Sequence, residues 1–127
     1  DGFILMGNSL GARVVCYILN ALSTKGKHYI KDVYLFGGAI GNAKENWKDA
    51  EKAVAGTIYN FYSKNDSILN YLYRPAQVMQ ENPFTSSPIG LDELILGKMS
   101  QNFDVTKKIN GHMEYKPKLR ELLALMS

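Results

Sequence analysis

The sequence of 127 residues is poor in cysteine and contains no long apolar segment. Its single cysteine, Cys16, cannot form an internal disulfide, so no disulfide framework defines the fold. That content fits a reducing compartment, with the cytoplasm slightly favoured, although the sequence does not fix the localisation. No apolar run approaches the roughly 20 residues that a membrane-spanning helix needs. The first six residues are too short, and lack the basic flank, for a signal peptide.

The chain also has little net charge and no basic stripe. Its formal net charge is +3, and its Lys and Arg residues are scattered. The nearest basic cluster, residues 25–31, is explained by a solvated loop, and nucleic acid is therefore not an expected partner. The hydrophobic fraction of 46% is enough for the core of one domain, and we treat residues 1–127 as a single domain.

Strand patterns alternate with helix patterns along the chain. We expect strands at residues 3–6, 32–36, 57–62 and 102–105, and helices at residues 10–22, 43–55, 68–73 and 116–126. Prolines interrupt residues 67–100, which we interpret as an irregular excursion or partial lid within the domain. The alternation predicts an α/β fold, a mainly parallel sheet with helices on both faces. Such sheets usually have more strands, and the sequence opens directly on a strand without an initiator Met. We therefore expect an incomplete domain whose N-terminal part lies upstream.

The segment Gly7-Asn8-Ser9-Leu10-Gly11 matches the pattern Gly-x-Ser-x-Gly between a predicted strand and a predicted helix. In this setting the pattern is typical of a nucleophile elbow, a tight turn that projects the serine hydroxyl above the sheet. Glycines two residues either side relieve crowding in the turn. The helix N-terminus supplies free N–H groups, and the N–H of Leu10 is a candidate oxyanion donor. Neither a dinucleotide fingerprint nor a P-loop is present, so we predict no cofactor and no metal.

A serine nucleophile needs a histidine base, oriented by a carboxylate, and in this fold the chain order is serine, acid, histidine. His112 lies in the turn between the last predicted strand and the last helix. His28 comes too early and is interpreted as a surface residue. Asp66 follows the third predicted strand, at the sheet edge where active sites form, although it could also cap the following helix. We therefore predict Ser9, Asp66 and His112 as a catalytic triad.

Three segments of the sequence resemble the DUF726 family of α/β-hydrolase-like proteins, which includes the transmembrane and coiled-coil domain-containing protein 4 group. They are 7–14, then 60–66 with Ile68-Leu69 and Leu72-Tyr73-Arg74, and Gly111-His112 with Tyr115. The resemblance implies a serine-hydrolase fold with the triad on Ser9, Asp66 and His112, and says little about substrate. This chain lacks the transmembrane segments of some members. Asn8 stands where lipases often have histidine, which weakens a lipase interpretation.

Together these features predict a serine hydrolase of the esterase or lipase type. It would act on a carboxylester or lipid acyl bond of a small-molecule or lipid substrate, through an acyl-enzyme. The second oxyanion donor normally comes from a loop after an early strand, which this sequence does not contain. Apolar residues of the excursion could form a wall for an acyl chain or simply pack on the sheet. Two alternatives remain open: a non-catalytic α/β-hydrolase-like interaction module, and a flavodoxin-like ligand-binding domain.

Overall fold

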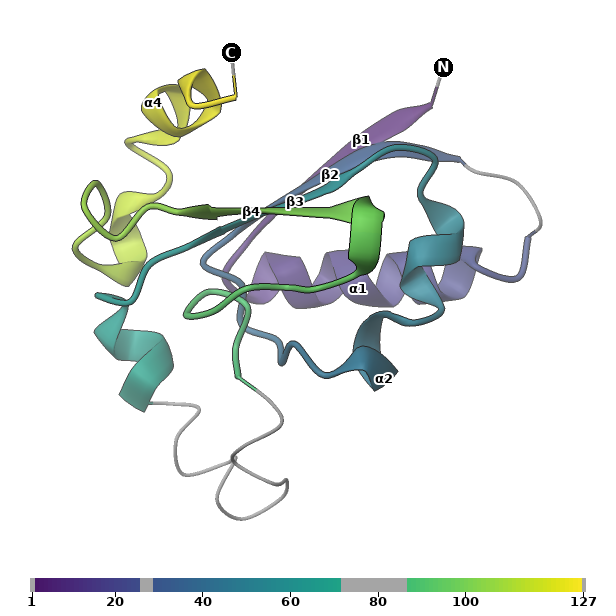
Figure 1. Ribbon diagram of the computed structural model, residues 1–127, viewed down its shortest axis with the longest axis horizontal. Helices are drawn as coiled ribbons and strands as arrows, with labels where there is room; N and C mark the ends of the chain where they lie inside the picture. Colours follow the sequence, from purple (N-terminus) through teal and green to yellow (C-terminus); the bar gives the residue numbers. More distant parts are fainter. Residues whose placement is uncertain (1, 26–28, 72–86, 127) are drawn as a thin grey trace.

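The computed structural model describes residues 2–25, 29–71 and 87–126. Its centre is a sheet of four parallel strands in the order β1-β2-β3-β4, and each strand pairs with the next one along the chain (Figure 1). The strands are β1 (Phe3–Asn8), β2 (Ile30–Phe36), β3 (Ile58–Tyr62) and β4 (Ser100–Asp104). The predicted α/β class and parallel sheet are confirmed. Within the described residues, β1 is an edge strand with β2 as its one neighbour.

One face of the sheet is covered by α1 (Leu10–Leu22), α2 (Lys44–Trp47) and the short 3-10 helix η1 (Ala50–Ala53). The buried positions of α1 recur at helical spacing, so one stripe of this helix packs on the sheet. The core on this side joins that stripe to alternate residues of the strands. Its fully buried members include Ala12, Leu19, Val33, Leu35, Trp47 and Ile58.

The opposite face is aromatic, and α4 (Leu119–Ala124) packs on it near the carboxyl ends of the strands (Figure 1). Phe36, Phe61 and Phe103 stack across three neighbouring strands, with ring centroids 4.8 Å apart in both pairs. Leu122 of α4 is fully buried against this side. Helices therefore lie on both faces, as the sequence predicts, while β1 keeps exposed apolar side chains. The strand ends that carry Ser9 and Asp66 lie at one edge between the two layers.

The predicted helix at residues 43–55 is wrong in its continuity, because α2 ends at Trp47 and η1 follows separately. The carbonyl of Asn46 accepts hydrogen bonds from the Cys16 thiol and the Asn20 amide of α1, both at 3.2 Å. A carbonyl turned towards α1 is not available to the next turn of its own helix. The break lets Trp47 and Ala50 both be buried completely.

Part of the excursion at residues 67–100 packs on the sheet, while Ile68, Tyr71 and Ile95 are exposed. Residues 67–71 are helical, and the remainder of the predicted helix at 68–73 lies outside the described residues, as do His28, Pro75, Pro83 and Phe84. Ile89 and Leu94 are fully buried in the core on the α1 face. The amide of Asn60 on β3 donates to the carbonyls of Ile89 and Asp92, at 3.0 and 3.1 Å. A 3-10 helix, η2 (Gly97–Met99), then leads into β4.

Candidate active site

Ser9 occupies the sharp turn between β1 and α1 with a backbone conformation that L-residues rarely adopt. Its φ is 59° and its ψ is −120°, and among the described residues no other non-glycine residue has a positive φ. Such a conformation costs on the order of 1–3 kcal/mol and persists only where surrounding contacts impose it. Here the Ser9 N–H donates to the Phe36 carbonyl at 3.0 Å, and the Ser9 carbonyl accepts from Ala12 and Ala39. Hydrogen bonds to β2 and its following loop therefore hold the turn.

The two glycines of the motif have different surroundings. A Cβ on Gly7 would lie 2.7 Å from the Gly11 carbonyl oxygen and 2.8 Å from the Ala12 backbone, so no larger residue fits there without displacing α1. A Cβ on Gly11 would meet nothing within 4 Å. The crowding expected from the sequence applies to Gly7 and is wrong for Gly11 within the described residues.

His112 joins Ser9 to Asp66 through its two ring nitrogens. The Nε2 atom lies 2.6 Å from Ser9 Oγ, and the Nδ1 atom lies 2.6 Å from Asp66 Oδ2. His112 begins the 3-10 helix η3 (His112–Glu114) after β4, and Asp66 follows β3. Asp66 is fully buried and His112 is 9% exposed. The three residues predicted from the sequence therefore come together in one chain of hydrogen bonds.

Asp66 has a partner for each carboxylate oxygen. While Oδ2 faces the imidazole, Oδ1 accepts the backbone N–H of Leu69 at 3.0 Å, as a helix cap does. The carboxylate thus contacts the imidazole and caps the following helix at the same time. Tyr115 lies nearby, and its pKa is raised by burial and then by the negative charges of Asp66 and Asp104. Within the described part of the chain, its buried Oη has no hydrogen-bond partner.

The loop that carries His112 is closed by Glu114. Its Oε1 accepts the backbone N–H of Asn110 at 3.1 Å and the ammonium of Lys118 at 3.0 Å. The hydrogen bond from Asn110, followed by that from Lys118, lowers the pKa of the Glu114 carboxyl below its ordinary range. The carboxylate form therefore stabilises the turn that surrounds His112.

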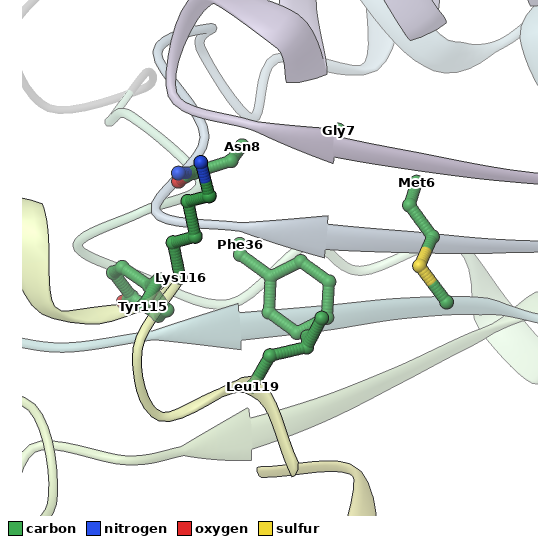
Figure 2. Close-up of a pocket in the computed structure, with 7 residues that line it drawn as sticks. All are labelled: Met6, Gly7, Asn8, Phe36, Tyr115, Lys116 and Leu119. Atoms are coloured by element: carbon green, nitrogen blue, oxygen red, sulfur yellow. The ribbon is translucent and has the colours of Figure 1, made fainter.

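A pocket of about 190 Å³ lies next to these residues, between β1 and the start of α4 (Figure 2). Met6, Phe36 and Leu119 give it an apolar lining, and Asn8 and Lys116 add polar side chains (Figure 2). Asn8 directly precedes Ser9, and Lys116 comes four residues after His112. A small apolar group fits a space of this size, since an apolar cavity of roughly 150 Å³ can hold benzene.

Leu10, the predicted oxyanion donor, is the first residue of α1, and its role stays a prediction. The sequence did not single out Ser63 or Glu114, whose side chains bond to the backbone around the site. A small polar residue directly after the predicted strand at residues 57–62 was the available signal for Ser63. In residues 2–25, 29–71 and 87–126 there is no group of three His, Cys, Asp or Glu side chains that could hold a metal. No helix in the same ranges is long and apolar enough to cross a membrane.

A parallel α/β sheet, with a serine on a strained strand-to-helix turn and a His–Asp pair at the neighbouring strand ends, defines an α/β-hydrolase-like domain. The chain belongs to the family described as protein of unknown function DUF726, whose model matches residues 1–127. This membership agrees with the resemblance seen in the sequence.

Three relatives show how this region occurs in longer proteins. The chain is 38% identical to the uncharacterized membrane protein C6F6.13c of Schizosaccharomyces pombe, 30% identical to the uncharacterized membrane protein F35D11.3 of Caenorhabditis elegans and 33% identical to the probable lipase MIL1 of Saccharomyces cerevisiae. Each match covers 94% of this chain but only 15%, 19% and 11% of the respective relative. The chain thus spans less than a fifth of the length of each of these relatives. No solved structure matches it.

Proposed function

We propose that this domain is a serine hydrolase that cleaves an ester-type bond, either a carboxylester or a lipid acyl bond, through an acyl-enzyme. The observation that carries the proposal is the continuous contact from Ser9 Oγ through the His112 ring to Asp66, with 2.6 Å at each step. A serine hydroxyl is a weak nucleophile unless a base removes its proton, and this arrangement supplies an oriented base.

In the proposed reaction, Ser9 Oγ attacks the substrate carbonyl carbon while His112 Nε2 takes the hydroxyl proton. Asp66 holds the imidazole with Nδ1–H towards the carboxylate and stabilises its charged form. The tetrahedral intermediate collapses as His112 donates the proton to the leaving alcohol, leaving the acyl group on Ser9. Water, deprotonated by His112, then hydrolyses the acyl-enzyme and restores the Ser9 hydroxyl.

The developing oxyanion needs hydrogen-bond donors, and we assign one to the Leu10 N–H at the start of α1.

A second donor and further strands are expected from sequence upstream of this chain. Support comes from the apolar side chains of β1: Ile4 is 50% exposed and Met6 is 51% exposed. On α1, Leu10, Val14, Tyr17 and Ile18 form a second, exposed apolar stripe beside the buried one. Parallel sheets are normally covered on both faces, so these surfaces fit a larger domain.

An apolar acyl or alcohol group is the substrate feature that the surroundings favour. The pocket between β1 and α4 has a mainly apolar lining that includes Asn8, the residue before the nucleophile. One relative carries the name probable lipase. The alternative function is a non-catalytic interaction module of the same fold. A precise hydrogen-bond chain at a strained serine disfavours that alternative, because neither feature is needed for binding a partner.

Labelling with a fluorophosphonate probe tests the proposal, using the full-length protein that contains this chain. We expect labelling of the wild type and none of Ser9→Ala. Ser23→Ala is a matched control, because Ser23 also lies at an end of α1 but has an ordinary backbone conformation, and its hydroxyl donates to Asn20. A well-folded wild type without Ser9-dependent labelling would favour the interaction module.

A further inference from the structure

Ser63 is a buried polar residue that lies between the segments carrying Asp66 and His112. It directly follows β3, and its exposed fraction is 0%. Its backbone N–H donates to the Gly90 carbonyl at 3.0 Å, and its carbonyl accepts the Asp66 N–H at 3.3 Å. The backbone hydrogen bonds of Ser63 therefore fix the start of the turn that carries Asp66.

The hydroxyl of Ser63 makes two further bonds, one to each segment. It donates to the carbonyl of Ile109 at 2.6 Å and accepts the backbone N–H of Asn65 at 3.2 Å. Asn65 immediately precedes Asp66, and Ile109 lies three residues before His112. Ile109 is itself fully buried. One hydroxyl group thus connects the turn of the acid to the loop of the base, in a place without solvent to replace it.

We propose that Ser63 is a positioning residue that sets the distance between Asp66 and His112 by bonding the acid turn to the carbonyl of Ile109. This inference rests on the proposed serine hydrolase function. Ser63 does not act on substrate; it acts through the two residues that orient and polarise Ser9. Small displacements at such a site cost much activity, because proton transfer requires near-ideal geometry.

Other hydrogen bonds between the Asp66 turn and the segment that leads to His112 lie at the protein surface. The Asn65 amide donates to the Thr106 carbonyl at 3.1 Å, and the Lys64 N–H donates to the Thr106 hydroxyl at 3.0 Å. Both are exposed to solvent, so water can replace either partner. Asn65→Ala therefore removes one side-chain bond between these segments without leaving a buried group unpaired, and it serves as the matched control.

The test compares wild type, Ser63→Ala, Ser63→Cys and Asn65→Ala in the full-length protein. The readouts are the rate of fluorophosphonate labelling at Ser9, kcat and KM for p-nitrophenyl butyrate, and the melting temperature. For Ser63→Ala we expect kcat and the labelling rate to fall at least roughly tenfold, with KM within about twofold. Ser63→Cys retains a weak donor, so its kcat and labelling rate should lie between those of wild type and those of Ser63→Ala. Asn65→Ala should match wild type.

The outcomes separate the two proposals. A folded Ser63→Ala that labels at the wild-type rate overturns the role of Ser63 and leaves the hydrolase proposal intact. The role of Ser63 is also overturned if Ser63→Ala and Asn65→Ala lose equal fractions of the labelling rate and kcat, in proportion to their losses of melting temperature. That result would indicate a merely structural role. If Ser63→Ala does not fold, Ser63→Cys decides by the same criteria. A wild type without Ser9-dependent labelling overturns both proposals.

Discussion

The ring of Tyr115 lies directly against the backbone of Gly37, at a point where no Cβ atom could fit. A Cβ on Gly37 would be 2.7 Å from Tyr115 Cε2, and the φ of Gly37 is +53°, which L-residues rarely adopt. Tyr115 follows η3, the helix that begins with His112, and its ring also contacts Phe36 at a centroid distance of 6.2 Å. The loop of His112 is thus seated on the end of β2.

We predict that Gly37→Ala destabilises the protein by about 2 kcal/mol or more, from the strained φ and the overlap with Tyr115. Because the ring must move, Ser9 labelling by a fluorophosphonate should also slow. Urea unfolding and labelling rates measure the two effects. Unchanged stability would mean that the ring and backbone are not in contact.

The two glycines of the elbow should respond differently to the same substitution. Gly7→Ala should destabilise the protein and reduce labelling, because the new methyl group would overlap the backbone of Gly11 and Ala12. Gly11→Ala, in open space within α1, should be neutral or stabilise by up to about 1 kcal/mol through helix propensity. Urea unfolding of both variants is the measurement. Equal losses of unfolding free energy in the two variants would show that a neighbouring segment also crowds Gly11.

Asp66 allows its two roles to be separated. In Asp66→Asn the amide oxygen can still cap the helix through the Leu69 N–H, so stability should change by less than about 1 kcal/mol. Hydrolysis should nevertheless fall on the order of 10³- to 10⁴-fold, because the amide favours the wrong imidazole tautomer. Asp66→Ala should lose both activity and stability. Steady-state kinetics and urea unfolding, run on the same preparations, give the comparison. An active Asp66→Asn would exclude Asp66 as the acid.

The bonds of Glu114 predict a pH dependence of stability. The Asn110 and Lys118 hydrogen bonds lower the pKa of the folded carboxyl below its ordinary value of 4.5. Its stabilisation is therefore present above pH 4.5 and is lost as the pH falls through the lowered value. The difference in unfolding free energy between wild type and Glu114→Gln should shrink on acidification from pH 5 towards pH 3. Glu121→Gln, which removes an exposed carboxyl on α4, is the control for the loss of one negative charge.

Cys16 should be chemically inert in the folded protein. It is 1% exposed, and burial raises the pKa of its thiol to about 11. At pH 8 the thiolate is therefore on the order of one part in a thousand, and reagents cannot reach it. Iodoacetamide should leave the native protein unmodified at this position and alkylate it after unfolding in urea, as measured by mass spectrometry. Equal reaction rates in both states would contradict the packing of α1.

The sequence predicts the elements best where the pattern and the packing agree. The helix at residues 10–22 coincides with α1, because its buried stripe follows the helical period. The prediction of one helix at residues 43–55 is wrong because the Asn46 carbonyl accepts hydrogen bonds from α1. No local sequence pattern indicates such a contact between segments. The strand ends differ by one to two residues for the same reason: pairing with a neighbour sets them, as in β2, which begins at Ile30.

At the candidate site, the sequence predicts residue types and chain order but not the supporting contacts. Ser9, Asp66 and His112 are identifiable because the chemistry requires those side chains at strand ends. The bond from Ser63 to Ile109 joins residues 46 positions apart, and the carbonyl of Ile109 is a backbone group that every residue has. Whether Gly11 is crowded likewise depends on neighbours in space, and the motif alone gave the wrong expectation.

The edge position of β1 has a practical consequence for the isolated chain. From Phe3 to Asn8 the strand carries no charged side chain, and Phe3 is 70% exposed. Natural edge strands usually carry charges, prolines or bulges that deter a second strand from pairing. Apart from a register irregularity between Phe3 and Ile4, β1 has no such feature. A preparation of these 127 residues alone should therefore be prone to edge-to-edge aggregation, and Ile4→Lys should improve its solubility.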